Sequence, residues 1–135
     1  MLTVLTECPM FQGVPLDGLT ALAERGQKRT FPRGAQIARQ GEISQSLHIV
    51  LKGHVCVERS HPSIVEPIIL AELGPGEVVG LEVLNGQPRS ATVRAVEETE
   101  TLRLEAAVLV EALAEFPEVS LALLRALSRR LQASD

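Results

Sequence analysis

The sequence is almost without aromatic residues. Its 135 residues include three Phe and no Trp or Tyr. Hydrophobic residues still make up 45% of the chain, which excludes an intrinsically disordered protein. The core must therefore be aliphatic, built from Leu, Val, Ile and Ala. A chain of this length is the usual size of one domain, and we expect a single domain over residues 1–135.

Metal-binding residues are scarce and poorly spaced. The two cysteines, Cys8 and Cys56, form no CxxC motif, and an iron–sulfur cluster needs about four thiolates. His48, His54 and His61 are six and seven residues apart, without the H-x-H pair of a cupin-type metal site. We predict that the histidines face solvent on strands and that the protein needs no metal or other cofactor.

Basic charge is also limited. The formal net charge is −4, which argues against direct binding to nucleic acid, because contacts to phosphates need clustered Lys and Arg. Arg125, Arg129 and Arg130 cluster near one end, and a solvated helix face explains them. No run approaches the ~18–20 apolar residues of a membrane span, and the N-terminus lacks the basic region of a signal peptide. We therefore expect a cytoplasmic protein without membrane contact.

Helical periodicity is confined to the two ends of the chain. Residues 15–25 carry apolar side chains at three-to-four-residue spacing, and Gly26 ends the run. Residues 105–116 form a second predicted helix, and Pro117 suits the first turn of a third helix over 117–135. A heptad-type seam follows this last helix through Leu124, Leu127, Leu131 and Ser134. Such a seam serves either the core of the chain or a homodimer, and both stay open.

Short β-prone runs separated by turn residues fill the middle of the chain. They recur at spacings of roughly eight to twelve residues, which favours an antiparallel sandwich or roll. The runs span 27–31, 35–39, 47–52, 54–59, 64–73, 90–96 and 100–105. The predicted order is an N-terminal helical segment (1–26), a β-rich body (27–105) and two C-terminal helices (106–135).

A glycine-rich segment, 74–93, reads GPGEVVGLEVLNGQPRSATV and has the parts of an anion site. Its first three residues form a tight turn, and a short helix is predicted to begin at Gly80. The N–H groups of a helix N-terminus suit an anion. Arg89 offers a bidentate fork to a phosphate, and Ser90 and Thr92 offer hydroxyl groups. A hairpin with a surface arginine is the simpler alternative.

The order of these residues resembles the phosphate-binding cassette of cyclic-nucleotide-binding domains. PGEVVG, the short helix and PRSATVRA match the family's cassette in order, and the closing LSRRLQ resembles the last helix of catabolite-activator-type (Crp/Fnr) regulators. The resemblance covers nearly the whole chain. It implies a mainly β fold with flanking helices, an antiparallel double-stranded β-helix or jelly-roll-like β-roll. This roll has a short N-terminal helix and two C-terminal helices.

The resemblance also assigns roles to individual residues. Arg89 corresponds to the arginine that pairs with the cyclic phosphate, and Gly80 to the cassette glycine. Ser90 and Thr92 fall at the phosphate-facing entry of the next strand. Ser134 falls where the regulators carry a hydroxyl near the purine.

Three features depart from the family pattern. Leu81 stands where a glutamate should accept a hydrogen bond from the ribose 2′-hydroxyl, and Glu82 follows one place later. The segment from Gly80 to Pro88 is also one residue shorter than the common form, and one residue turns a helix by about 100°. Full regulators continue into a helix-turn-helix domain, whereas this chain stops at Asp135. It is then either a lone sensory domain or one from which a DNA-binding half has been removed.

The predicted function is that of a ligand sensor and not of an enzyme. The sequence has no GxSxG, HExxH or P-loop motif. The leading hypothesis is a regulatory domain that binds a phosphate-containing effector, first of all cAMP or cGMP, and signals through its last helix. The main alternative is a degenerate module that binds no nucleotide and serves in dimerisation or protein interaction. A metal-dependent cupin-like enzyme is a distant third.

Overall fold

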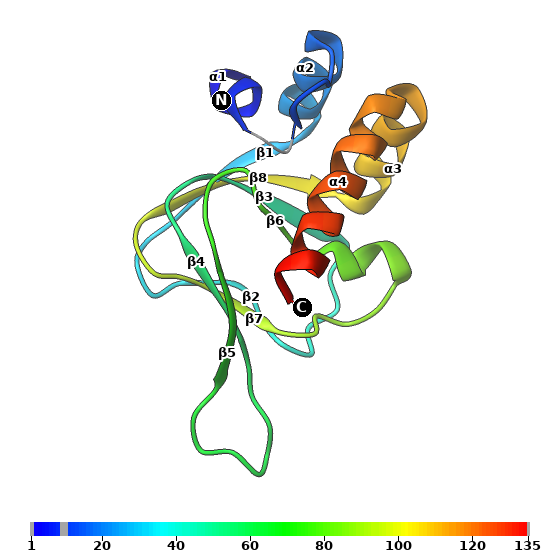
Figure 1. Cartoon of the computed structure of the whole chain (residues 1–135). Helices are drawn as coiled ribbons and strands as arrows, with labels where there is room; N and C mark the ends of the chain where they lie inside the picture. The colour runs from blue at the N-terminus through cyan, green and yellow to red at the C-terminus, as the bar shows by residue number, and fades with distance from the viewer. Residues whose placement is uncertain (1, 9–10, 135) are drawn as a thin grey trace.

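The fold is built on two four-stranded antiparallel sheets (Figure 1). The computed structural model describes residues 2–8 and 11–134, apart from the side chains of residues 130, 133 and 134. The first sheet has the strand order β1 (Gln27–Phe31), β8 (Thr99–Glu105), β3 (Ser46–Lys52), β6 (Val78–Val79). The second has the order β2 (Gln36–Ala38), β7 (Thr92–Ala95), β4 (Val55–Arg59), β5 (Ile68–Leu73). The predicted antiparallel β-roll with flanking helices is confirmed.

Four α-helices lie at one end of this roll, beside the first sheet (Figure 1). They are α1 (Leu2–Glu7), α2 (Leu16–Arg25), α3 (Ala106–Glu115) and α4 (Pro117–Ser134). Strand β8 runs into α3 without a loop, and Pro117 separates α3 from α4 as expected. Among the described residues, none of the helices combines the length and apolarity that a membrane span requires.

The larger part of the core lies between the first sheet and the helices. Successive side chains of a strand point to opposite faces, so Leu47, Ile49 and Leu51 of β3 turn together toward the helices. Their neighbours in this cluster include Leu22 and Val119, which are fully buried. The core is therefore aliphatic, as the composition predicts.

A smaller cluster fills part of the space between the two sheets. Its buried members are Ala38, Val50, Val55, Val79 and Val93. The alternate residues of β3 that face this space are Ser46, His48 and Val50, and all three are buried. The roll interior is thus apolar at one end and polar at the other.

Three elements differ from the sequence prediction. Helix α1 was not expected, because six residues are too short for a helical period to show. Strand β6 has only two residues and forms by pairing with His48 and Ile49, far away in sequence. Strand β5 begins at Ile68, just after Pro67, and not at residue 64, since proline cannot donate a ladder hydrogen bond.

The hairpin of β4 and β5 projects from the body of the roll (Figure 1). All residues from 60 to 70 are exposed. Five of them are large and aliphatic: Ile64, Val65, Ile68, Ile69 and Leu70. This hairpin lies at the opposite end of the roll from the helices.

Candidate ligand site in the roll

The glycine-rich segment forms a turn, a bend and one short helix. Gly74 to Glu77 make the predicted tight turn, in which the Glu77 N–H donates to the Gly74 carbonyl at 3.2 Å and Gly76 has φ 88°. Leu81–Asn85 then form a five-residue 3₁₀ helix, η2. So few peptide dipoles add little to anion binding, which must therefore rest on side chains.

Arg89 is the central residue of the site. Its side chain is only 4% exposed and points into the polar end of the roll. Nη2 donates to the Ser44 hydroxyl at 3.1 Å and to the Ser46 carbonyl at 2.6 Å. Nε and Nη1 are buried and have no hydrogen-bond partner within the described part of the chain. Two donors of a buried guanidinium are therefore free for a ligand.

The charge of Arg89 is poorly compensated. No salt bridge to it is formed among the described residues. Burial lowers the pKa of its guanidinium, and Glu82 and Glu42 act against that shift from a distance. Because guanidinium does not lose its proton in proteins, a buried positive charge remains. An anion at Nε and Nη1 would satisfy both the charge and the two N–H groups.

Gly80 makes room for this guanidinium. A Cβ atom built on residue 80 would overlap Nη1 of Arg89. The backbone of Gly80 is also left-handed, with φ 90° and ψ 21°, a conformation that favours glycine. The cassette glycine and the cassette arginine predicted from the sequence are thus brought into contact.

The cavity beside Arg89 has a volume of about 350 Å³. It opens between the two sheets and takes residues from β1, β2, β3, β8 and the loop before β3. The lining residues are Arg29, Phe31, Ile37, Glu42, Ile43, Ser44, Ser46, His48, Arg89 and Arg103. Three arginines and one glutamate make this a positively charged pocket. Only Arg89 was singled out from the sequence.

His48 corrects the expectation that the histidines face solvent. It is 4% exposed, its Nδ1 lies 2.8 Å from the Thr101 hydroxyl, and its ring stands edge-on to Phe31. Burial, followed by the charges of Arg89, Arg103 and Arg29, lowers the pKa of His48 to about 4. The imidazole is therefore neutral at pH 7. His54 and His61 are exposed, as predicted.

The other predicted site residues lie outside this cavity. Oε1 of Glu82 accepts a hydrogen bond from the Ser90 N–H at 3.3 Å, and the Thr92 hydroxyl accepts one from the Gln40 N–H at 3.0 Å. Leu81 packs against the larger core cluster. The side chain of Ser134, at the end of α4, lies outside the described residues.

A second, apolar groove of about 470 Å³ separates η2 from α4. It is lined by Leu81, Glu82, Leu84, Asn85, Leu113, Ser120, Leu123, Leu124 and Leu127. Figure 1 shows the end of α4 beside the short helix of the glycine-rich segment. Leu81 and Glu82 thus face the terminal helix.

Potential metal ligands do not come together in the described part of the chain. No group of three or more His, Cys, Asp and Glu side chains there could hold a metal ion. Cys8 and Cys56 are both free and buried.

Comparison with known proteins agrees with this geometry. A family profile described as "Cyclic nucleotide-binding domain" matches residues 28–116. A Mycobacterium tuberculosis protein named CRP-like cAMP-activated global transcriptional regulator is 31% identical over 133 residues, which cover 98% of this chain and 59% of that protein. The Cyclic AMP receptor protein of Thermus thermophilus is 35% identical over 128 residues, with coverages of 94% and 59%.

A solved structure has the same architecture. The crystal structure of Thermus thermophilus Catabolite Activator Protein superposes with a TM-score of 0.82 at 34% identity, over 94% of this chain and 60% of that chain. The present chain therefore spans about three-fifths of the length of these relatives.

Proposed function

We propose, since this chain belongs to the cyclic-nucleotide-binding domain family, that its roll cavity binds the phosphate of a small effector, with cAMP or cGMP the first candidate. The observation that carries this proposal is Arg89, whose Nε and Nη1 are buried at a positively charged cavity and find no partner among the residues that the structure describes. Charge-assisted hydrogen bonds from a guanidinium fork are the ones that phosphate forms best. The names of the relatives favour cAMP over other organic phosphates.

Binding in this site rests on the phosphate more than on the ribose. Leu81 cannot accept a hydrogen bond, and Glu82 is turned toward the Ser90 N–H and the apolar groove. We therefore assign the phosphate to Arg89 and Gly80, with Ser90 and Thr92 in supporting positions at the edge of the site. The affinity for a cyclic nucleotide is then modest.

The occupied cavity signals through α4. Gly80, which touches Arg89, immediately precedes η2, and η2 faces α4 across the apolar groove. A ligand that draws Arg89 and Gly80 into a new position changes the surface that η2 presents to α4. Such coupling operates if the ligand binds one arrangement of the helix better than the other. In this proposal the chain is the non-enzymatic sensing part of a regulator.

A degenerate module without a nucleotide is the second candidate. Two observations favour it: the missing carboxylate at Leu81 and the exposed side chains of Leu124, Leu127 and Leu131 along α4. An exposed leucine seam suits pairing with a second copy of the helix. In both versions α4 is the homodimer surface, and the two differ in whether the cavity is ever filled.

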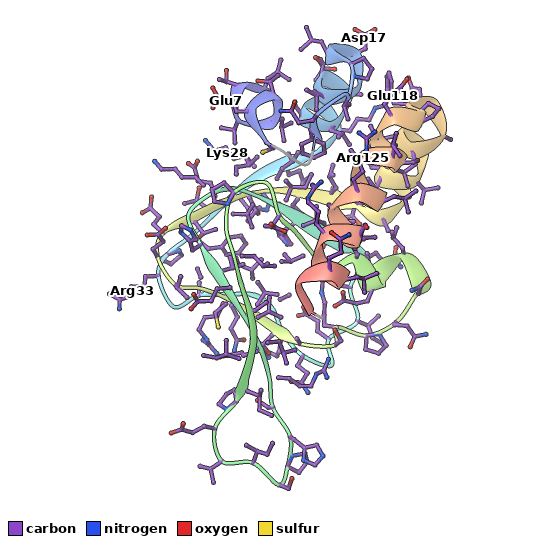
Figure 2. The ribbon with its side chains drawn as sticks, viewed as in Figure 1. Glu7, Asp17, Lys28, Arg33, Glu118 and Arg125 are labelled. Atoms are coloured by element: carbon purple, nitrogen blue, oxygen red, sulfur yellow. The ribbon has the colours of Figure 1, made fainter. Side chains whose placement is uncertain are left out.

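Calorimetric titration of the chain with cAMP and cGMP separates the two candidates. We expect binding that Arg89→Ala weakens by about 10- to 150-fold, the equivalent of the roughly 1.5–3 kcal/mol that charged hydrogen bonds contribute. Arg89→Lys retains the positive charge but lacks the guanidinium fork. Its affinity should fall between those of the unmodified chain and Arg89→Ala. Arg33→Ala is the matched control, because Arg33 is exposed and points into solvent (Figure 2). If the unmodified chain binds neither cAMP nor cGMP, the degenerate module is the function that remains.

A further inference from the structure

Two arginines at the cavity converge on a single neutral oxygen. Oε1 of Gln27 accepts a hydrogen bond from Nη2 of Arg29 at 2.9 Å and from Nη1 of Arg103 at 3.2 Å. Gln27 pairs with Arg103 across β1 and β8, whereas Arg29 lies two residues further along β1. Residues two apart on a strand share a face, so the sheet itself holds the two guanidinium groups near each other.

These two arginines line the same cavity as Arg89. Arg29 and Arg103 belong to the first sheet, whereas Arg89 comes from the segment before β7. His48, paired with Arg103 across β3 and β8, is also a lining residue. The cavity thus has one anion-binding group at the cassette and a second pair of cations on the opposite sheet.

Acidic residues do not balance this charge. Glu42 is the only carboxylate among the lining residues. Glu105 forms an ion pair with Arg103 at 2.7 Å, whereas Arg29 forms none within the described part of the chain. Burial, and then the charges of the same three arginines, lower the pKa of His48, which lines this cavity. Like charges held this close favour an anion between them.

We propose that Arg29 and Arg103, held together by the Gln27 oxygen, form a second anion subsite, so that a nucleotide with a second anionic group binds this chain more tightly than a nucleotide with one. The first group lies at Arg89, and this part rests on the proposed function above. The second group displaces the Gln27 amide oxygen and bridges the two guanidiniums. Bisphosphorylated nucleotides are the class of ligand that fits, because they place two phosphates on one small skeleton.

Three adenosine phosphates test the number of anionic groups. Calorimetry compares cAMP, adenosine 5′-monophosphate and adenosine 3′,5′-bisphosphate against the unmodified chain. The last two differ only by the second phosphate. We expect the bisphosphate to bind at least tenfold more tightly than the monophosphate. Equal affinities would overturn the second subsite and leave phosphate binding at Arg89 intact.

Variants locate the second phosphate. Arg29→Gln and Arg103→Gln should each reduce the preference for the bisphosphate to less than threefold while leaving the affinity for the monophosphate nearly unchanged. Lys28→Gln is the matched control: it removes one charge from the same strand, but Lys28 pairs with Glu100 and is not among the residues that line the cavity. An equal loss with Lys28→Gln would show a general effect of net charge and contradict the subsite.

Glu42→Gln gives a test of opposite sign. Removing the one lining carboxylate should strengthen bisphosphate binding, and an unchanged affinity would count against an anion held by the field of the cavity. Arg89→Ala distinguishes the two proposals. If Arg89→Ala abolishes monophosphate binding, and the unmodified chain binds the bisphosphate no more tightly than the monophosphate, only the second subsite fails. If Arg89→Ala changes neither affinity, and Arg29→Gln weakens bisphosphate binding, only the assignment of the first phosphate to Arg89 fails. Thermal unfolding of each variant confirms that it is folded.

Discussion

Gly80 and Arg89 fit together so closely that no side chain can be placed between them. A Cβ atom on residue 80 would overlap Nη1, one of the two free donors of the buried guanidinium. We predict that Gly80→Ala abolishes anion binding by pushing the guanidinium away, in addition to about 1–2 kcal/mol of strain in the left-handed backbone. Calorimetry with cAMP and denaturant unfolding measure the two effects separately.

Gly86→Ala is the control for that strain. Gly86 is also left-handed, with φ 69°, but nothing lies within 4 Å of a Cβ atom there. Both alanine variants should lose similar stability, whereas only Gly80→Ala loses binding. If Gly86→Ala lost binding to the same extent, the contact with Arg89 would not be the reason.

His48 should make the fold sensitive to acid. Its pKa falls from 6.5 to about 4 on folding, so the native state favours the neutral imidazole. This contribution is complete above pH 6.5 and is lost as the pH falls through 4, and the difference is worth about 3 kcal/mol. We predict that His48→Gln, which does not titrate, removes that part of the pH dependence of the unfolding free energy.

The control for this prediction is His61→Gln, because His61 is exposed and its ring hydrogen-bonds to Ser63, two residues away. Its unfolding free energy is measured over the same pH range. A His48→Gln profile parallel to that of the unmodified chain would show that His48 does not titrate differently in the native state.

The ribose 2′-hydroxyl should contribute little to binding. Glu82, the carboxylate next to Leu81, is hydrogen-bonded to the Ser90 N–H and is not among the residues that line the cavity. We predict that cAMP and its 2′-deoxy analogue bind with affinities within threefold of each other. A deoxy analogue that binds tenfold or more weakly would mean that Glu82 turns inward, and Glu82→Gln would then remove the difference.

The leucine seam of α4 predicts self-association. Leu124, Leu127 and Leu131 are 63%, 38% and 70% exposed in the single chain, which is unusual for a leucine row at heptad spacing. Light scattering should find a dimer at micromolar concentrations, and Leu127→Lys should shift it to the monomer. Leu16→Lys, an exposed leucine on α2, should have no effect. A monomeric unmodified chain would contradict the prediction.

Helices and strands whose sequence pattern lies within a few neighbouring residues were predicted well. The helix of residues 15–25 appears as Leu16–Arg25, and the run 27–31 is β1 as predicted. Gly80 and Arg89 were each assigned to the cassette through the family resemblance of one short segment, but their contact with each other was not predicted. Turn chemistry and proline positions decide such features, and both can be read from neighbouring residues.

Features that depend on distant pairing could not be predicted in the same way. Strand β3 is buried on both faces, so its sequence has no alternation that shows which way His48 points. Gln27 and Arg103 are 76 residues apart, and only the pairing of β1 with β8 brings them together. The charged cavity is therefore a property of strand order, which local patterns do not contain.

That strand order also has a consequence for how the chain acquires its structure. In the first sheet β1 lies beside β8, and β8 separates it from β3. Within the described residues, β1, the first strand of the roll, therefore has no ladder partner until β8, its last strand, has emerged. The chain between β1 and β8 must be closed into a loop before the pairing of these two strands can stabilise it. Folding should therefore be slow compared with that of helical proteins of the same size. Helices α2 and α3 pack against β8, so we expect the helical end to dock on the roll only once β8 is in place.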